Sequence, residues 1–148
     1  MIDLKKNFLI YGYGVSGKSI AKYLKNKNSN YQIYDDHKII LNSDKVINKT
    51  LVIKNINKFD YFVVSPSIKI DKNHFLFKYK NKILIDLDFL SLEFNKHIII
   101  GITGTEGKST TCQYLSQTIS RKYKNIILGN FGNTILDKKN IQKYINTI

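Results

Sequence analysis

The sequence has a single cysteine, Cys112, and a single proline, Pro66. One thiol cannot form a disulfide within the chain, which suits a reducing compartment. No apolar run approaches the roughly 20 residues that span a bilayer, and the first residues lack the apolar core and the small-residue cleavage site of a secretory signal peptide. We therefore expect a cytoplasmic protein that has no membrane partner.

Arginine is also scarce, because all but one of the 24 basic residues are lysine. The formal net charge of +13 would ordinarily suggest a nucleic-acid partner. Base-specific contacts, however, mostly use the planar guanidinium of arginine, and the lysines here are scattered among abundant Ile, Asn and Tyr. We therefore predict no nucleic-acid partner, although the diffuse positive charge would favour small anionic ligands such as nucleotides.

A glycine motif follows the first apolar run of the chain. Residues 7–11 form that run, and Gly12, Gly14 and Gly17 then spell G-x-G-x-x-G ahead of a helical pattern that reaches Lys25. A strand, a glycine turn and a helix in this order are typical of the first unit of a Rossmann-like nucleotide-binding domain. The motif by itself is a weak signal, so the residues after it decide the interpretation.

An acidic residue closes the next predicted strand, residues 31–34. Asp35 lies 18 positions after Gly17, close to the roughly 20 at which the Rossmann fingerprint places a carboxylate on a ribose hydroxyl. We interpret Asp35 as a binding residue. The alternative is a solvated carboxylate at the end of a strand.

A further predicted strand, residues 61–64, ends in Ser65, Pro66 and Ser67. Ligands of open α/β sheets bind at the carboxyl ends of the strands, so we expect this turn to face the glycine motif; the alternative is an ordinary turn. Less distinct patterns predict short strands at 51–53 and 83–85, a helix at 74–79 and a connector at 86–94. The three histidines show no metal-ligand spacing, and packing or surface roles are expected for His37, His74 and His97.

The second distinctive stretch begins at His97. Residues 97–102 include four isoleucines and predict a buried strand, which leads into the loop T-G-T-E-G-K-S-T at 103–110. An amphipathic helix follows, with Cys112, Leu115 and Ile119 along one stripe. A last strand is predicted at 125–128.

This loop has the features of a phosphate site. Gly104 and Gly107 let backbone N–H groups turn inward, Lys108 supplies a positive charge, and Ser109 or Thr110 can place a hydroxyl on Mg²⁺. The first glycine of a strict Walker A pattern would fall on an isoleucine. The loop is therefore similar to Walker A without matching it.

The chain length and composition fit one complete domain and part of another. Hydrophobic residues make up 43% of the 148 residues, enough to build a core. We predict an α/β fold: a Rossmann-like parallel-sheet domain at residues 1–95, and at 96–148 the first strand, loop, helix and strand of a P-loop-type ATPase domain.

Three motifs stand in one order along the chain: Y-G-Y-G-V-S-G-K-S at 11–19, V-V-S-P-S-I at 63–68, and G-I-T-G-T-E-G-K-S-T-T at 101–111, followed by L-G-N-F-G-N at 128–133. This series resembles the Mur ligases, and among them the type that adds D-glutamate, over essentially the whole chain. Ser67 stands where that family usually has glycine, and Glu106 where it usually has asparagine.

The resemblance implies an ADP-forming ligase of peptidoglycan precursor synthesis that uses ATP and Mg²⁺. It would join UDP-N-acetylmuramoyl-L-alanine to D-glutamate through an acyl phosphate. The implied precursor-binding residues are Gly12, Gly14, Val15, Ser16, Gly17, Asp35, Ser65, Pro66, Ser67 and Asn130. The implied ATP-binding residues are Gly104, Thr105, Glu106, Gly107, Lys108, Ser109 and Thr110, with Lys108 as the catalytic residue and Ser109 or Thr110 toward Mg²⁺.

The family's remaining magnesium ligands, its D-glutamate site and its C-terminal domain have no counterpart in this sequence. We therefore expect the N-terminal portion of such a ligase, inactive alone, as a truncation, a decayed copy or a split-gene product whose missing domains a second chain supplies. The alternatives are a non-catalytic module that binds UDP-sugars or nucleotides, and a small NAD-dependent oxidoreductase.

Overall fold

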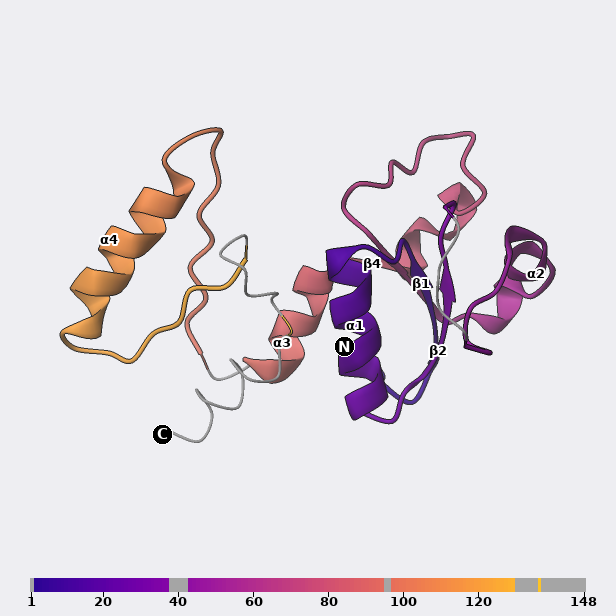
Figure 1. Ribbon diagram of the computed structural model, residues 1–148, viewed down its shortest axis with the longest axis horizontal. Helices are drawn as coiled ribbons and strands as arrows, with labels where there is room; N and C mark the ends of the chain where they lie inside the picture. The colour runs from indigo at the N-terminus through magenta and orange to yellow at the C-terminus, as the bar shows by residue number, and fades with distance from the viewer. Residues whose placement is uncertain (1, 38–42, 95–96, 130–135, 137–148) are drawn as a thin grey trace. The chain divides into compact units, whose positions relative to one another are not determined.

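The computed structural model describes residues 2–37, 43–94, 97–129 and 136. The chain divides into two compact units, Met1–Phe89 and Leu90–Ile148 (Figure 1). We call them the sheet unit and the loop-helix unit and describe each separately. The predicted domain boundary at 95–96 lies outside the described residues and stays a prediction.

A sheet of four parallel strands forms the centre of the sheet unit. Its order is β2-β1-β3-β4, with bounds β1 Asn7–Tyr11, β2 Asn30–Tyr34, β3 Tyr61–Val64 and β4 Ile83–Leu84. β1 pairs with strands on both sides, so that Ile10 lies between Ile33 and Val63 in the register. The all-parallel sheet confirms the predicted α/β fold class, and the first three strands lie where the apolar runs predicted them.

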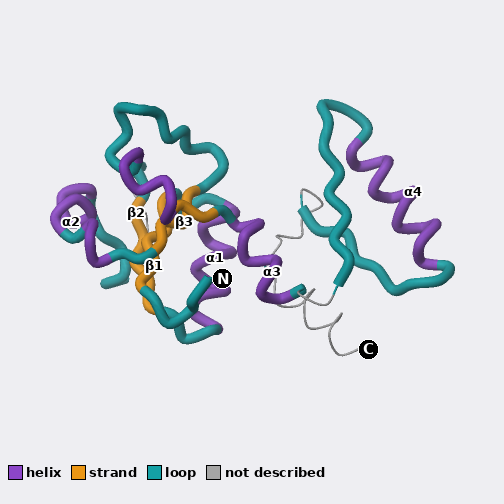
Figure 2. The backbone as a smooth tube through the Cα atoms, turned by 180° about the vertical axis from the view of Figure 1, so that it is seen from behind, coloured by secondary structure: helices purple, strands orange, loops and turns teal. Residues whose placement is uncertain are grey.

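The strands alternate their side chains between two covered faces, as the two-residue period of a strand requires. Helix α1, Val15–Asn26, covers one face of the sheet (Figure 2), where its Gly17 lies against the Ile10 side chain. Its apolar stripe is buried at Ile20, Ala21 and Leu24, as its periodicity predicted. A separate cluster fills the opposite face, formed by Leu9, Tyr11, Tyr34, Val52, Phe59, Phe62, Val64 and Leu76.

Residues 51–53 are helical, so the strand predicted there is wrong. They belong to helix α2, Lys49–Lys54, which begins where the Asn48 side chain accepts the N–H of Leu51 at 2.9 Å. An asparagine in this position caps a helix, and Val52 alone is buried. The apolar triplet was too short to distinguish one helical face from a strand.

The helix predicted at 74–79 is displaced toward the carboxyl end. Its residues form a turn followed by a 3-10 helix at Phe77–Lys82, because the side chains of Asp71 and His74 accept the backbone N–H groups of Asn73 and Leu76. Such local bonds compete with helix formation. The remaining short helices are the 3-10 helices Ile56–Lys58 and Asp86–Phe89 and helix α3, Leu90–Glu93.

The loop-helix unit contains helix α4, Lys108–Ser120, which starts at the end of the glycine loop as predicted. Its stripe of Cys112, Leu115 and Ile119 is half-buried. The strands predicted at 97–102 and 125–128 are wrong, because neither segment pairs with another described segment to form a strand. Ile98 is 93% exposed, and a strand forms only where another strand supplies its hydrogen-bond partners.

No helix within the described ranges is long and apolar enough to cross a membrane.

Hydrogen exchange should separate the two apolar runs. The amides of Leu9 and Ile10 belong to a strand that is paired on both sides and buried, so we expect them to exchange orders of magnitude more slowly than those of Ile98–Ile100. The measurement is amide exchange followed by NMR. Equal protection of the two segments from exchange would instead support the predicted strand at 97–102.

Candidate functional site

The glycine motif and the serine-proline turn lie together at the carboxyl edge of the sheet. The last backbone bonds of the two ladders hold them there: the Gly12 N–H donates to the Tyr34 carbonyl and the Ser65 N–H to the Tyr11 carbonyl, both at 2.9 Å. A Cβ built on Gly12 would lie 2.7 Å from the Cβ of Ser65. Gly12 also has a φ of +94°, a conformation that glycine adopts without strain.

The other two glycines of the motif serve different purposes. Gly17 is buried against the loop, and a Cβ there would lie 1.9 Å from the Gly12 carbonyl oxygen. Gly14 is exposed, has nothing within 4 Å of such a Cβ, and precedes α1 without a side-chain cap. The first N–H groups of a helix have no partner inside it, so this end of α1 can accept an anion.

The neighbouring binding residues predicted from the sequence vary in exposure. Val15 is 75% exposed, Ser16 is half-buried, and Pro66 and Ser67 are exposed. The hydroxyls of Ser65 and Ser67 are 3.4 Å apart. Asn130 lies outside the described residues.

Asp35 is bonded to the glycine loop. Its carboxylate accepts the Tyr13 N–H at 2.5 Å and the His37 N–H at 2.8 Å. Two carboxylate oxygens offer about four lone-pair positions, so Asp35 can still accept a ligand hydroxyl.

Asp36, which the sequence did not single out, is bonded on the other side of the strand end. Its two oxygens accept the hydroxyls of Tyr11 and Tyr34, each at 2.5 Å. These two hydrogen bonds hold the pKa of the Asp36 carboxyl below its usual range. Burial, followed by the bond to Asp36, raises the pKa of each tyrosine well above 10. The strand register could have indicated this cluster, because Tyr11 of β1 pairs directly with Tyr34 of β2.

Asp86 is the second residue that the sequence did not indicate. It lies just after β4, and with Gly12, Ser16, Ser65 and Pro66 it lines a narrow recess at the same edge. Its position two residues beyond a parallel strand was the available signal.

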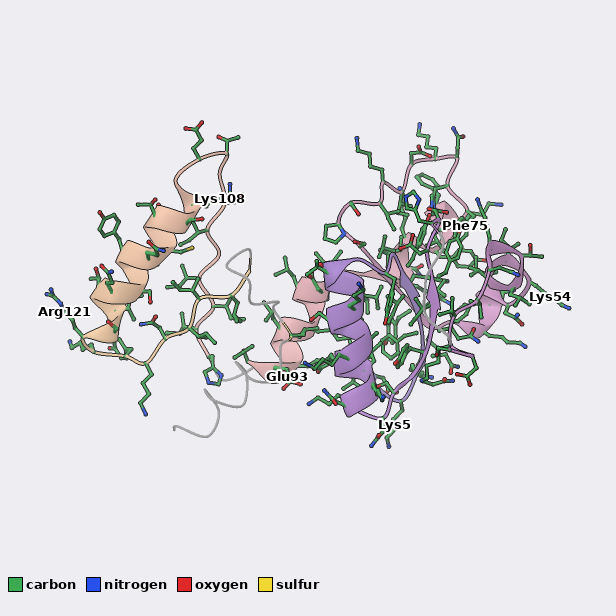
Figure 3. The ribbon with its side chains drawn as sticks, viewed as in Figure 1. Lys5, Lys54, Phe75, Glu93, Lys108 and Arg121 are labelled. Carbon is green, nitrogen blue, oxygen red and sulfur yellow. The ribbon has the colours of Figure 1, made fainter. Side chains whose placement is uncertain are left out.

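The second predicted site is the loop before α4. Gly104 and Gly107 have φ values of +149° and +72°, and Gly107 caps the helix. The Lys108 ammonium folds back to donate to the carbonyls of Gly104 and Thr105; Figure 3 labels Lys108 where the loop joins the helix. Thr105, Glu106, Ser109 and Thr110 are exposed.

Most of the chain matches known enzymes. A UDP-N-acetylmuramoylalanine–D-glutamate ligase from Francisella philomiragia is 34% identical over an alignment of 145 residues, and the match covers 92% of this chain and 32% of the ligase. The ligase of the same name from Francisella tularensis subsp. tularensis is 34% identical over an alignment of 135 residues, and that match covers 88% of this chain and 30% of the ligase. The chain is homologous to these ligases.

The chain spans about a third of the length of these Mur ligase relatives. No family model matches the sequence. Within the described ranges no group of three or more His, Cys, Asp or Glu side chains could hold a metal ion. The assignment of Ser109 and Thr110 to Mg²⁺, like the rest of the site assignments, therefore stays a prediction.

The glycine motif of this chain allows a matched pair of substitutions. Gly17→Ala forces a methyl group against the Gly12 carbonyl, and we expect it to destabilise the chain by roughly 1–3 kcal/mol, as overpacking does. The gain in helix propensity, at most about 1 kcal/mol, does not offset this. The measurement is urea unfolding followed by circular dichroism.

Gly14→Ala is the control, because its methyl group would meet open space. It should cost only about 0.5 kcal/mol, from the weaker N-cap. Equal losses of unfolding free energy in the two variants would contradict the separate roles assigned to Gly14 and Gly17.

Proposed function

We propose that the sheet unit binds the UDP part of UDP-N-acetylmuramoyl-L-alanine and that the loop-helix unit binds ATP with Mg²⁺. Together they would serve an ADP-forming ligation of the precursor to D-glutamate. The observation that carries this proposal is the meeting of the glycine loop and the Ser65–Ser67 turn at the carboxyl ends of adjacent parallel strands, in a chain homologous to ligases of that name.

The geometry at this edge suits a nucleotide diphosphate. The uncapped start of α1 offers N–H groups and the positive end of the helix dipole to the pyrophosphate. Gly14, exposed and without a side chain, leaves the backbone open to close approach. Asp35 keeps lone pairs for a ribose hydroxyl while it holds the loop through Tyr13.

The loop before α4 suits the phosphates of ATP. Its glycines at 104 and 107 turn the backbone, and the start of α4 presents unpaired N–H groups. Lys108 now satisfies two loop carbonyls, and it would exchange them for phosphate oxygens, which form stronger charge-assisted bonds. The hydroxyls of Ser109 and Thr110 lie in the first turn of α4, where Mg²⁺ between the phosphates would meet them.

Ligation requires an activated carboxylate. In the proposed reaction the precursor's terminal carboxylate takes the γ-phosphoryl group, ADP leaves, and the amine of D-glutamate displaces phosphate as the amide bond forms. The protein contributes positioning and positive charge. Because the chain spans about a third of the length of its relatives, we propose that it binds both nucleotides and does not complete the reaction alone.

Isothermal titration tests the sheet unit. We expect heat of binding with UDP-N-acetylmuramoyl-L-alanine and with UDP, and none with NAD. An Asp35→Asn variant, which keeps the size of the side chain but weakens its acceptor, should bind the precursor roughly ten- to a hundredfold more weakly, because a hydrogen bond to a charged group contributes about 1.5–3 kcal/mol. Tighter binding of NAD than of the UDP ligands would contradict the proposal and favour the oxidoreductase.

ATP binding tests the loop. Lys108→Ala should weaken it roughly tenfold or more, the value of a charge-assisted contact. Lys122→Ala, at an exposed position just beyond the carboxyl end of α4, is the matched control and should leave the affinity unchanged.

An ADP-release assay with precursor, D-glutamate and ATP completes the test. We expect no turnover from the 148-residue chain by itself. Sustained, Lys108-dependent turnover would show that the chain is a complete ligase and would contradict the division of labour proposed here.

A further inference from the structure

A series of hydrogen bonds connects a half-buried histidine, His74, to the carboxyl edge of the sheet. His74 Nε2 lies 3.3 Å from the Tyr11 hydroxyl, which donates to Asp36, and Tyr34 donates to the other Asp36 oxygen. His74 also stacks on the rings of Phe75 and Tyr11, with centroids 4.6 and 5.5 Å apart; Figure 3 labels Phe75 in this region. None of these contacts is needed for the nucleotide contacts proposed above.

The contacts fix the tautomer of His74. Its Nδ1 accepts the N–H of Leu76 at 3.1 Å, so that nitrogen carries no proton and the neutral ring has its proton on Nε2. Nε2 therefore donates to Tyr11, and the single hydroxyl proton of Tyr11 is free to go to Asp36. Each donor in this series of hydrogen bonds faces an acceptor only while His74 is neutral.

Protonation of His74 would break this arrangement. The imidazolium carries a second proton on Nδ1, which would face the N–H of Leu76 with no acceptor between them. Among the charged groups that face the ring, Asp36 and Asp71 favour the protonated form and Lys49 opposes it; burial outweighs them, so the pKa of His74 lies below its ordinary value. The neutral, bonded form is therefore the one present at neutral pH.

We propose that His74 is a positioning residue: through Tyr11 and Asp36 it holds the strand-end turn that carries Asp35 against the glycine loop. Asp35 and Asp36 are adjacent in the chain, and Asp35 accepts the N–H of Tyr13 in that loop. A change at His74 is thus transmitted to the loop through two carboxylates. That this loop faces the precursor rests on the function proposed above, whereas the coupling itself does not.

NMR of the ligand-free chain tests the coupling directly. To remove the other imidazole at this edge, the measurements use the His37→Gln background. We expect the Tyr13 amide shift to follow the His74 ring titration with the same midpoint, below pH 6.5. His74→Gln, whose amide offers a donor near the Nε2 position, should abolish the titration of the Tyr13 shift.

Two tyrosine variants form a matched pair. Both Tyr11→Phe and Tyr34→Phe remove one hydrogen bond to Asp36 and keep the ring, but only Tyr11 stands between His74 and Asp36. Tyr11→Phe should uncouple the Tyr13 shift from His74, while Tyr34→Phe should leave it coupled. The proposal would be overturned if the Tyr13 amide shift did not follow the His74 titration, or if it followed that titration equally in the two variants.

Precursor binding supplies the functional readout. The pyrophosphate of the precursor is esterified at both ends and so lacks the phosphate ionisation near pH 6. We expect the affinity to fall roughly two- to tenfold between pH 7.5 and 5, the effect of about one lost hydrogen bond. His74→Gln should keep the affinity at pH 7.5 and remove the decline, and the control His97→Gln, in the loop-helix unit, should retain it.

The two failures are distinguishable. Absence of precursor binding at every pH contradicts the proposed function, and the NMR titration then decides the coupling by itself. Precursor binding whose pH profile is the same in His74→Gln overturns the positioning role while the proposed function stands.

Discussion

The parallel pairing of β1 on both sides is the constraint on which the candidate site depends. Because β2 and β3 run in the same direction as β1, their carboxyl ends must meet at one edge. The last bonds of the two ladders join Gly12 to Tyr34 and Ser65 to Tyr11. Residues separated by more than 50 positions in the chain thus become neighbours, and these bonds place the glycine loop beside the Ser65 turn.

The two adjacent aspartates just beyond β2 make separate hydrogen bonds. Asp35 bonds to the loop at the carboxyl edge, whereas Asp36 bonds to Tyr11 and Tyr34, whose rings belong to the core on the face opposite α1. That core therefore includes hydrogen-bonded hydroxyl groups as well as apolar side chains. Its tyrosine hydroxyls need acceptors once they are buried, and a carboxylate at the strand end supplies them while it ties the core to the loop.

The sequence was informative where structure is set locally. Continuous apolar runs between turn residues located β1, β2 and β3, and helical periodicity located α1 and α4. The sequence could not predict contacts that depend on strand register, because no local pattern connects His74 to Tyr11 or Asp36. It also could not distinguish the role of Gly14 from that of Gly17, since only the structure shows that Gly17 packs on the Gly12 carbonyl. At residues 51–53 a local signal existed, the Asn48 cap, but it was outweighed by an apolar triplet.

The loop-helix unit shows why an isoleucine run does not by itself make a strand. A helix closes its hydrogen bonds within its own segment, so α4 forms from residues 108–120 alone. A strand depends on a neighbour, and in this unit the described residues supply none to 97–102. The loop between them is ordered from its helical side: Gly107 caps α4 and Lys108 satisfies two carbonyls of the loop. A phosphate that reaches this loop must therefore compete only with neutral acceptors for the lysine, and a charged acceptor wins that exchange.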